Sequence, residues 1–284
     1  MSQWKEKVAV ITGAASGIGG GLARRCAELG MHVVVADVDR TGLDELEAAI
    51  ASTAASTLVA PTDVRDDAAV EALAARVFDA HGKVHLLFNN AGVLVAGKCW
   101  ERSIEDWRWN LDVNVMGVVH GIVSFVPRML AQGEAGRVIN TSSIGGLLGG
   151  GTFLGPYQTS KHAVVALTET LYAELELEDA PIAASVLCPG EVATGIFNSD
   201  RLRSEEERNH LGSEVERDFH ESVASGVAAG LKPDEFALRV FEGLEAGNFW
   251  LIPQPEFKPL FEMRTRSILD GTNPISTASL MEGR

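Results

Sequence analysis

Short runs of apolar and β-branched residues alternate with segments of helical periodicity along most of the chain. The runs "VAVI" and "HVVVA" are continuously apolar, which is typical of strands in a parallel sheet that is covered on both faces. Strands are predicted at residues 8–11, 32–36, 57–60, 85–90, 137–141, 183–188 and 249–252. Helices are predicted at residues 17–29, 41–52, 66–81, 104–129, 157–178 and 234–246.

This alternation predicts an α/β fold of the Rossmann-like, doubly wound type, with a seven-stranded parallel sheet and helices on both faces. We find no linker and no repeat, so residues 1–284 are predicted to form a single domain. Two segments depart from the alternation. Residues 190–230 are predicted to form a substrate lid, and residues 253–284 a C-terminal extension.

Composition narrows the class of function. The net charge of −15 disfavours a nucleic-acid partner, because phosphate neutralisation needs clustered Lys and Arg. Cys26, Cys99 and Cys188 lie far apart in the sequence, which suits a reducing compartment and indicates neither a disulfide framework nor a zinc site. His81 and His85 are four residues apart, but Gly82 marks a helix end between them, so no metal site is predicted.

The N-terminal sequence "MSQWKEKVAVITGAASG" has no long apolar region after its basic residues, so we expect no signal peptide. No stretch reaches the roughly 18 uninterrupted apolar residues that a membrane helix needs. We therefore expect a cytoplasmic protein with no membrane partner.

A glycine-rich turn joins the first predicted strand to the first predicted helix, with Gly13, Gly17 and Gly19 in a G-x-x-x-G-x-G spacing. Glycine permits positive φ and lets backbone N–H groups approach a pyrophosphate at the helix N-terminus. Asp37 follows the second predicted strand, where a carboxylate can bind the adenosine ribose and repel a 2′-phosphate. Alone, Asp37 could equally be a turn residue. With the turn upstream it predicts NAD binding, although Arg40 leaves NADP open.

Tyr157 and Lys161 are four residues apart, which places them on one face of a helix, one turn from each other. Taken alone, the pair is also consistent with an ordinary amphipathic helix start. The alternative is a phenol whose proton is transferred during catalysis.

The sequence resembles the short-chain dehydrogenase/reductase family over residues 5–252. The matching blocks are Thr12-Gly13-x-x-x-Gly17-Ile18-Gly19, Asp63-Val64, Asn89-Asn90-Ala91-Gly92, Asn114, Ser143, Tyr157-x-x-x-Lys161 and Pro189-Gly190. "SS" at Ser142 and Ser143 leaves two candidates for the catalytic serine, and the following "SIGG" favours Ser143. Ser142 is then interpreted as a structural hydrogen-bonding residue.

The resemblance implies a role for each catalytic residue. Tyr157 exchanges the proton of the substrate hydroxyl, with a pKa lowered by Lys161 and by a nicotinamide cation. Ser143 hydrogen-bonds the substrate oxygen, Lys161 also binds the nicotinamide ribose, and Asn114 holds a water that connects Lys161 to solvent. The implied cofactor-binding residues are Gly13, Ser16, Gly17, Ile18, Gly19, Asp37, Asp63, Val64, Asn90, Ala91, Gly92, Tyr157, Lys161, Pro189, Gly190, Val192 and Thr194.

A substrate pocket is predicted where residues 93–102, 146–156 and 190–230 leave the carboxyl ends of the strands. Its predicted apolar lining is Leu94, Val95, Trp100, Leu147, Leu148, Phe153, Leu154, Ile196 and Phe197. Such a lining suits a bulky neutral or aromatic alcohol. The alternative is that these side chains pack the lid and a subunit interface.

A further resemblance lies in "GVVHGIVSFVPRML", "SSIGGLLGGGTFLGPY" and "FWLIPQPEF". These blocks look like the family branch that contains the Cα-dehydrogenases of lignin-type aryl ethers. The expected function is NAD-dependent hydride transfer with a hydrophobic, including aromatic, secondary alcohol or ketone as the small-molecule substrate. We also expect a homo-oligomer, either a dimer or a tetramer. The alternatives are an NADPH-preferring carbonyl reductase and a non-catalytic dinucleotide-sensing protein.

Overall fold

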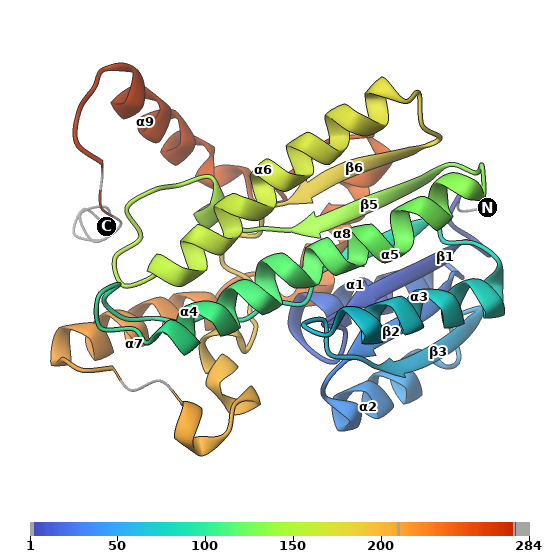
Figure 1. Ribbon diagram of the computed structural model, residues 1–284, viewed down its shortest axis with the longest axis horizontal. Helices are drawn as coiled ribbons and strands as arrows, with labels where there is room; N and C mark the ends of the chain where they lie inside the picture. The colour runs from blue at the N-terminus through green and yellow to red at the C-terminus, as the bar shows by residue number, and fades with distance from the viewer. Residues whose placement is uncertain (1–2, 209–210, 275, 277–284) are drawn as a thin grey trace.

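The computed structural model describes residues 3–208, 211–274 and 276. In this part of the chain, seven parallel strands form one sheet in the order β3-β2-β1-β4-β5-β6-β7 (Figure 1). The predicted doubly wound, seven-stranded parallel sheet is therefore confirmed. The strands are β1 (Val8–Thr12), β2 (His32–Asp37), β3 (Ser56–Pro61), β4 (Leu86–Asn89), β5 (Gly136–Thr141), β6 (Ile182–Leu187) and β7 (Trp250–Leu251).

Helices cover both faces of the sheet, which explains the continuous apolar runs in β1 and β2 (Figure 1). Along β1, Ala9 and Ile11 pack against one layer of helices, whereas Val8 and Val10 pack against the other. The first layer contains α1 (Gly17–Glu28), α2 (Arg40–Ile50) and α8 (Pro233–Glu245). The second contains α3 (Asp67–His81), α4 (Ile104–Leu111), α5 (Gly117–Ala131) and α6 (Gly155–Leu177).

The helix predicted at residues 104–129 is interrupted by one π-helical turn, η1 (Asp112–Met116), between α4 and α5. It begins at a capping box, in which the Asp106 N–H donates to Ser103 Oγ over 3.0 Å and the Ser103 N–H donates to Asp106 Oδ2 over 3.1 Å. Within the described residues, this continuous stretch (Ile104–Ala131) is the one helix that is long and apolar enough to cross a membrane by length and composition alone. Its α5 part packs against α3, β4 and β5, so the core accounts for much of its apolar surface.

Two further helices lie at the carboxyl ends of the strands, on the left of Figure 1. The segment at residues 190–230 contains the 3-10 turns η3 (Ile196–Leu202) and η4 (Glu205–Glu207), followed by α7 (Glu214–Ala228). The C-terminal extension contains η5 (Pro255–Phe257) and α9 (Lys258–Leu269). Neither α7 nor α9 was among the predicted helices, and residues 277–284 of the predicted extension lie outside the described residues.

At the opposite end of the sheet, a buried histidine links β1 to β4. Nδ1 of His85 accepts a hydrogen bond from the Val8 N–H over 2.9 Å, and Nε2 lies 3.1 Å from a carboxylate oxygen of Glu134. Lys83 and Lys7 also approach Glu134, at 2.6 and 3.7 Å. Burial lowers the pKa of His85 and outweighs the opposing effect of Glu134.

We expect the free energy of unfolding to fall as the pH drops below about 6.5, the ordinary pKa of histidine in an unfolded chain. A histidine with a lowered pKa binds fewer protons in the folded state, so protonation favours the unfolded state. His81 has a pKa shifted in the same direction, again through burial. Urea unfolding at neutral and mildly acidic pH measures the effect. His85→Asn, which keeps an acceptor near Nδ1, should weaken the pH dependence, and an unchanged dependence would contradict this account.

Candidate active site

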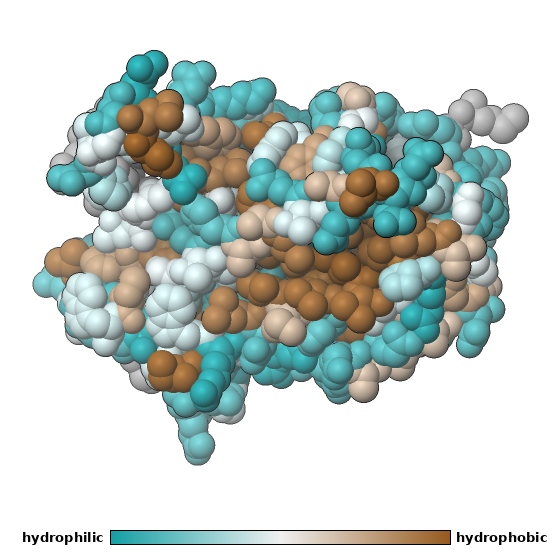
Figure 2. All heavy atoms as spheres, turned by 45° about the horizontal axis from the view of Figure 1, so that its top comes forward, coloured by the Kyte–Doolittle hydropathy of each residue, from teal (hydrophilic) through white to brown (hydrophobic). Residues whose placement is uncertain are grey.

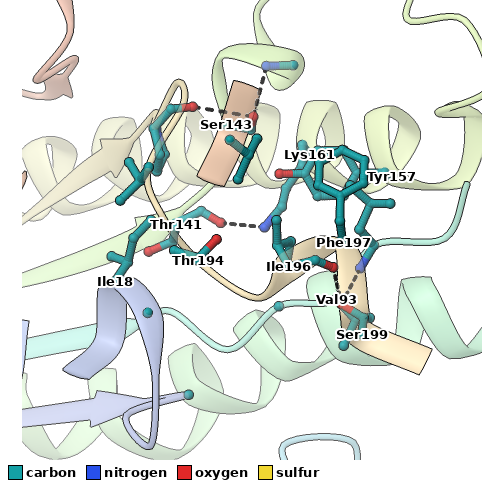
Figure 3. Close-up of a pocket in the computed structure, with 18 of the residues that line it drawn as sticks. Ile18, Val93, Thr141, Ser143, Tyr157, Lys161, Thr194, Ile196, Phe197 and Ser199 are labelled. Carbon is teal, nitrogen blue, oxygen red and sulfur yellow. Dashed lines mark hydrogen bonds between the residues drawn. The ribbon is translucent and has the colours of Figure 1, made fainter. Parts of the chain in front are cut away.

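A cavity of about 740 Å³ opens at the carboxyl ends of the strands. Its wall contains all seventeen predicted cofactor-binding residues, together with Ser143. Figure 3 shows part of this wall, with Ser143, Tyr157, Lys161, Ile18 and Thr194 among the labelled residues. Of the predicted catalytic and cofactor-binding residues, Asn114 alone is not in the wall.

The glycine-rich turn fits a pyrophosphate. Gly13 and Gly17 have φ values of 66° and 53°, a region that residues with a side chain rarely occupy. A Cβ on Gly13 would also lie 2.7 Å from the Cα of Ala91. No side chain caps the N-terminus of α1 at Ser16, and the first turn of α1 contains no acidic residue. The backbone N–H groups at this helix end can therefore bind an anion.

Asp37 places a fixed negative charge at the far end of the same groove. Its Oδ2 accepts a hydrogen bond from the Ala15 N–H and its Oδ1 accepts one from the Asp39 N–H, each over 3.0 Å. Arg40 pairs instead with Asp44 at 2.9 Å and does not line the cavity. The basic residue that left NADP open in the sequence is therefore engaged elsewhere.

Arg65 is a cavity residue that the sequence analysis missed. Its guanidinium donates to both carboxylate oxygens of Asp63, with a shortest distance of 2.6 Å. Hydrogen bonding to Arg65 holds the pKa of Asp63 below its usual value. This arginine sits two residues after a matched motif position, but the motif itself gives no sign of it.

Tyr157 and Lys161 enter the cavity from the first turns of α6, where Pro156 occupies the start of the helix. The Lys161 amine donates to the Thr141 carbonyl at the end of β5 over 3.0 Å and lies 5.7 Å from the centre of the Tyr157 ring (Figure 3). Ser143 Oγ accepts a hydrogen bond from the Gly145 N–H over 3.0 Å and donates to the Pro189 carbonyl over 3.4 Å. These contacts fix the serine and the lysine at one edge of the cavity.

Burial has the largest effect on the pKa values of both Lys161 and Tyr157. Loss of solvent lowers the pKa of Lys161 to about 8. It also raises the pKa of Tyr157, which a hydrogen bond with Ser143 only partly opposes. In the protein without a cofactor, desolvation of the phenolate therefore has the larger effect on the pKa of Tyr157, and the lowering expected from Lys161 together with a nicotinamide cation stays a prediction.

Asn114 lies in the π-helical turn η1, fully buried behind the cavity wall. Its Oδ1 accepts from the Val93 N–H over 2.8 Å, and its Nδ2 donates to the Val93 carbonyl and to Ser160 Oγ, each over 2.9 Å. Asn114 thus bonds to Ser160, the residue before Lys161 in the chain, and Ser160 Oγ in turn donates to the Tyr157 carbonyl over 2.7 Å.

The neighbouring polar residues mainly hold the strands together. Ser142 Oγ donates to the Lys161 carbonyl over 2.8 Å, in keeping with its interpretation as a structural residue. Asn90 donates from its side chain to the Thr12 carbonyl over 3.0 Å, and Asn89 bonds to Asn140 over 2.9 Å. These bonds tie β1, β4 and β5 together directly beneath the cavity.

The remaining part of the cavity is largely apolar. Five of the nine predicted pocket residues line it, namely Leu94, Leu148, Leu154, Ile196 and Phe197. The other four do not. Val95 is buried in the core, Leu147 packs against a neighbouring cluster, Phe153 packs against Phe219, and Trp100 is 81% exposed. In an irregular segment, the position of a residue in the sequence does not fix the side to which its side chain points. The sequence alone therefore could not separate the five residues that line the cavity from the four that do not.

Two other segments complete the apolar wall, and the sequence analysis named no residue in either. From α7 come Phe219, Val223 and Val227, and from the C-terminal extension come Phe257 and Leu260. Phe219, Val223 and Val227 have i, i+4, i+8 spacing, so they share one helix face. That spacing was the signal that could have placed α7 over the cavity.

No group of three or more His, Cys, Asp or Glu side chains within residues 3–208, 211–274 and 276 could hold a metal ion. The described part of the chain therefore offers no side-chain cluster for a metal site beside the cavity.

Comparisons with known proteins agree with this geometry. The family model described as "short chain dehydrogenase" matches residues 7–205. A crystal structure of a short-chain dehydrogenase/reductase from Burkholderia phymatum in complex with NAD has a TM-score of 0.92 and 41% identity, covering 97% of this chain and 99% of that one. A C alpha-dehydrogenase from Sphingobium sp. is 32% identical over 98% of this chain and 90% of its own length. A "CLA biosynthesis dehydrogenase/reductase" from Lactiplantibacillus plantarum is 30% identical over 100% and 99% of the two chains. The chain therefore belongs to the short-chain dehydrogenase family and is an oxidoreductase that acts on CH–OH groups.

Proposed function

We propose that the protein transfers a hydride between NAD and a hydrophobic secondary alcohol or ketone. The observation that carries the proposal is the composition of the one cavity wall. Tyr157, Ser143 and Lys161 share this wall with the glycine-rich turn and Asp37, which make up the groove, and with a set of apolar side chains, which make up the pocket. A dinucleotide fits the groove, and an alcohol in the apolar pocket would lie beside the phenol.

NAD held in the groove would supply the hydride acceptor for the carbinol carbon in oxidation and the hydride donor in reduction. Tyr157 accepts the hydroxyl proton as the carbonyl forms, and in reduction it returns that proton to the carbonyl oxygen. Ser143 hydrogen-bonds the same oxygen and positions it. The ammonium of Lys161 binds the nicotinamide ribose, and its charge favours the phenolate of Tyr157, as does a cationic nicotinamide. Asn114 donates a hydrogen bond to Ser160, the residue before Lys161. We propose that Asn114 also holds a water that connects Lys161 to solvent.

The preference for NAD is supported by the charges at the ribose end of the groove. Asp37 is held there by two backbone donors, while Arg40 is paired with Asp44. An NADPH-preferring reductase would need a free cation near this carboxylate. A dinucleotide sensor would have no use for a serine, a tyrosine and a lysine gathered at the cavity edge, so both alternatives rank below NAD-dependent catalysis.

The choice of a hydrophobic, including aromatic, substrate is supported by the apolar side chains in the cavity wall. Those in the segments after the strands and in the C-terminal extension include Leu94, Leu148, Leu154, Ile196, Phe197, Phe219, Val223, Val227, Phe257 and Leu260. Similarity to a C alpha-dehydrogenase points in the same direction. An apolar wall with a few convergent polar groups is typical of sites for bulky neutral ligands.

A screen of secondary alcohols with NAD⁺ and NADP⁺ tests this function through the absorbance of the reduced cofactor. We expect kcat/KM to rise as the apolar substituent grows, by up to about fourfold per added methylene group, since burying one contributes about 0.8 kcal/mol. Aryl carbinols should exceed short polar ones. A highest kcat/KM with a small charged hydroxy acid, or no gain with substituent size, would contradict the hydrophobic substrate class.

We also propose that the protein forms a homo-oligomer in the cytoplasm. Large apolar side chains are exposed along α5 and α6, including Val123 (65%), Leu130 and Tyr172. Figure 2 shows hydrophobic residues gathered in a band over this side of the molecule. Exposed apolar surface of this kind is typical of protein–protein contacts. The free thiols Cys26, Cys99 and Cys188 suit a reducing compartment.

A further inference from the structure

Glu191 is a cavity residue that the proposed mechanism does not use. It follows Gly190 on the loop after β6, and its side chain is partly buried. Its Oε1 lies 3.6 Å from the position that a Cβ on Gly226 of α7 would occupy. Gly226 lines the cavity as well. The carboxylate therefore faces α7 at a point where that helix has no side chain to cover it.

The backbone of Glu191 is held from two directions. Its carbonyl accepts a hydrogen bond from the side chain of the buried Gln254 over 2.8 Å and another from the Leu231 N–H over 3.1 Å. Gln254 also accepts from the N–H of Gly190 over 2.9 Å. The residue thus projects from an anchored turn, so the fold sets the position of its backbone beside α7.

Every other charged side chain in the cavity wall is already engaged. Asp63 pairs with Arg65, and Asp37 accepts from two backbone N–H groups. Lys161 donates to the Thr141 carbonyl, and Arg201 donates to the carbonyls of Gly195 and Asn198. In contrast, no hydrogen bond or ion pair joins the Glu191 carboxylate to any other described residue.

A carboxylate beside an apolar pocket favours a ligand with a hydrogen-bond donor, because an ionised carboxyl group can only accept hydrogen bonds. Val223 and Val227, which lie one turn before and directly after Gly226 on α7, contribute apolar walls and no donor. A bound substrate that displaced water from this place would leave the carboxylate without a partner unless it supplied one.

We propose that Glu191 selects substrates that carry a second hydrogen-bond donor, a hydroxyl or an ammonium group, at a distance from the reacting carbinol. The inference rests on the proposed function and narrows its substrate class to hydrophobic secondary alcohols with a second donor. A substrate carboxylate at the same place is disfavoured, since two like charges would face each other.

The test is a set of aryl secondary alcohols that differ only at the distal substituent, which is a methyl, hydroxymethyl, aminomethyl or carboxyl group. A hydrogen bond to a charged group contributes about 1.5–3 kcal/mol, which corresponds to roughly 10- to 100-fold in kcat/KM. We therefore expect the hydroxymethyl or aminomethyl compound to exceed the methyl compound by that factor. Whichever of the two is preferred identifies the donor as neutral or cationic.

In Glu191→Leu the ratio of kcat/KM between donor and methyl compounds should fall to near one. In Glu191→Gln, which keeps the shape, the preference for the aminomethyl compound should be lost first. Glu221→Gln is the matched control, because it removes an equal charge from an exposed position of α7 outside the cavity wall and should leave the ratio unchanged.

Three results would overturn the inference. These are equal kcat/KM for donor and methyl compounds in the wild-type protein, an undiminished ratio in both Glu191 variants, or a preference for the carboxyl compound. Absence of turnover with every secondary alcohol is a different result, because it would contradict the proposed function itself.

Discussion

Tyr157→Phe is expected to lower kcat for alcohol oxidation by about 10²–10⁴-fold, the contribution typical of a positioned acid or base. The substitution keeps the aromatic ring and removes only the group that exchanges the proton. Ser143, Lys161 and the groove keep their own partners, so cofactor binding should persist. Steady-state kinetics measures the first effect, and NADH fluorescence titration measures the second.

The chain provides its own control for this substitution, because it contains two tyrosines. Tyr172 lies on the same helix, is partly exposed and packs against Phe249 rather than the cavity. Tyr172→Phe should therefore retain near-normal turnover. If Tyr157→Phe also retained it, the assigned acid–base mechanism would be wrong.

The second large effect concerns the cofactor. The wild-type protein is expected to use NAD⁺ at least about 100-fold more efficiently than NADP⁺, because bringing the 2′-phosphate against Asp37 costs several kcal/mol and each ~1.4 kcal/mol is tenfold. Asp37→Ser removes the charge and should reduce this ratio, and Asp37→Arg should reduce it further. The measurement is kcat/KM for both cofactors with one alcohol at a fixed concentration.

Glu45→Gln is a suitable control, since it removes one negative charge from an exposed position of α2 without touching the cavity wall. Its preference for NAD⁺ should match that of the wild type. Equal efficiency of the wild-type protein with NADP⁺ would refute the role given to Asp37.

The sheet could be predicted from sequence because a strand that is covered on both faces is apolar over most of its length. β1 shows this directly, since all five of its residues are buried. The two helices that were not predicted, α7 and α9, have few buried residues. Glu216 is the one fully buried residue of α7, and Ser267 the one of α9. Because so few of their side chains reach the core, the main periodic signal in these two helices is the i, i+4, i+8 spacing of the cavity-lining Phe219, Val223 and Val227 in α7.

The cofactor groove was predictable because its chemistry requires particular residues at fixed spacing, as at Gly13 and Gly17. The lining of the substrate pocket was less predictable. Trp100 is apolar and lies in a segment near the cavity, yet it points to solvent, whereas Phe257 reaches the cavity from the C-terminal extension. Tertiary packing decides which side chains of an irregular segment face the cavity. Arg65 and Glu191 also lie in such segments, so the sequence did not show that they line the cavity.

Transfer of a deuterium label tests the central claim most directly. The wild-type protein is incubated with NAD⁺ and a hydrophobic aryl secondary alcohol that carries deuterium on its carbinol carbon, and the products are examined by NMR. Hydride transfer predicts one deuterium on the nicotinamide ring of NADH for each ketone formed. Ketone without deuterated NADH, or recovery of the alcohol with all of its label and no NADH, would contradict it.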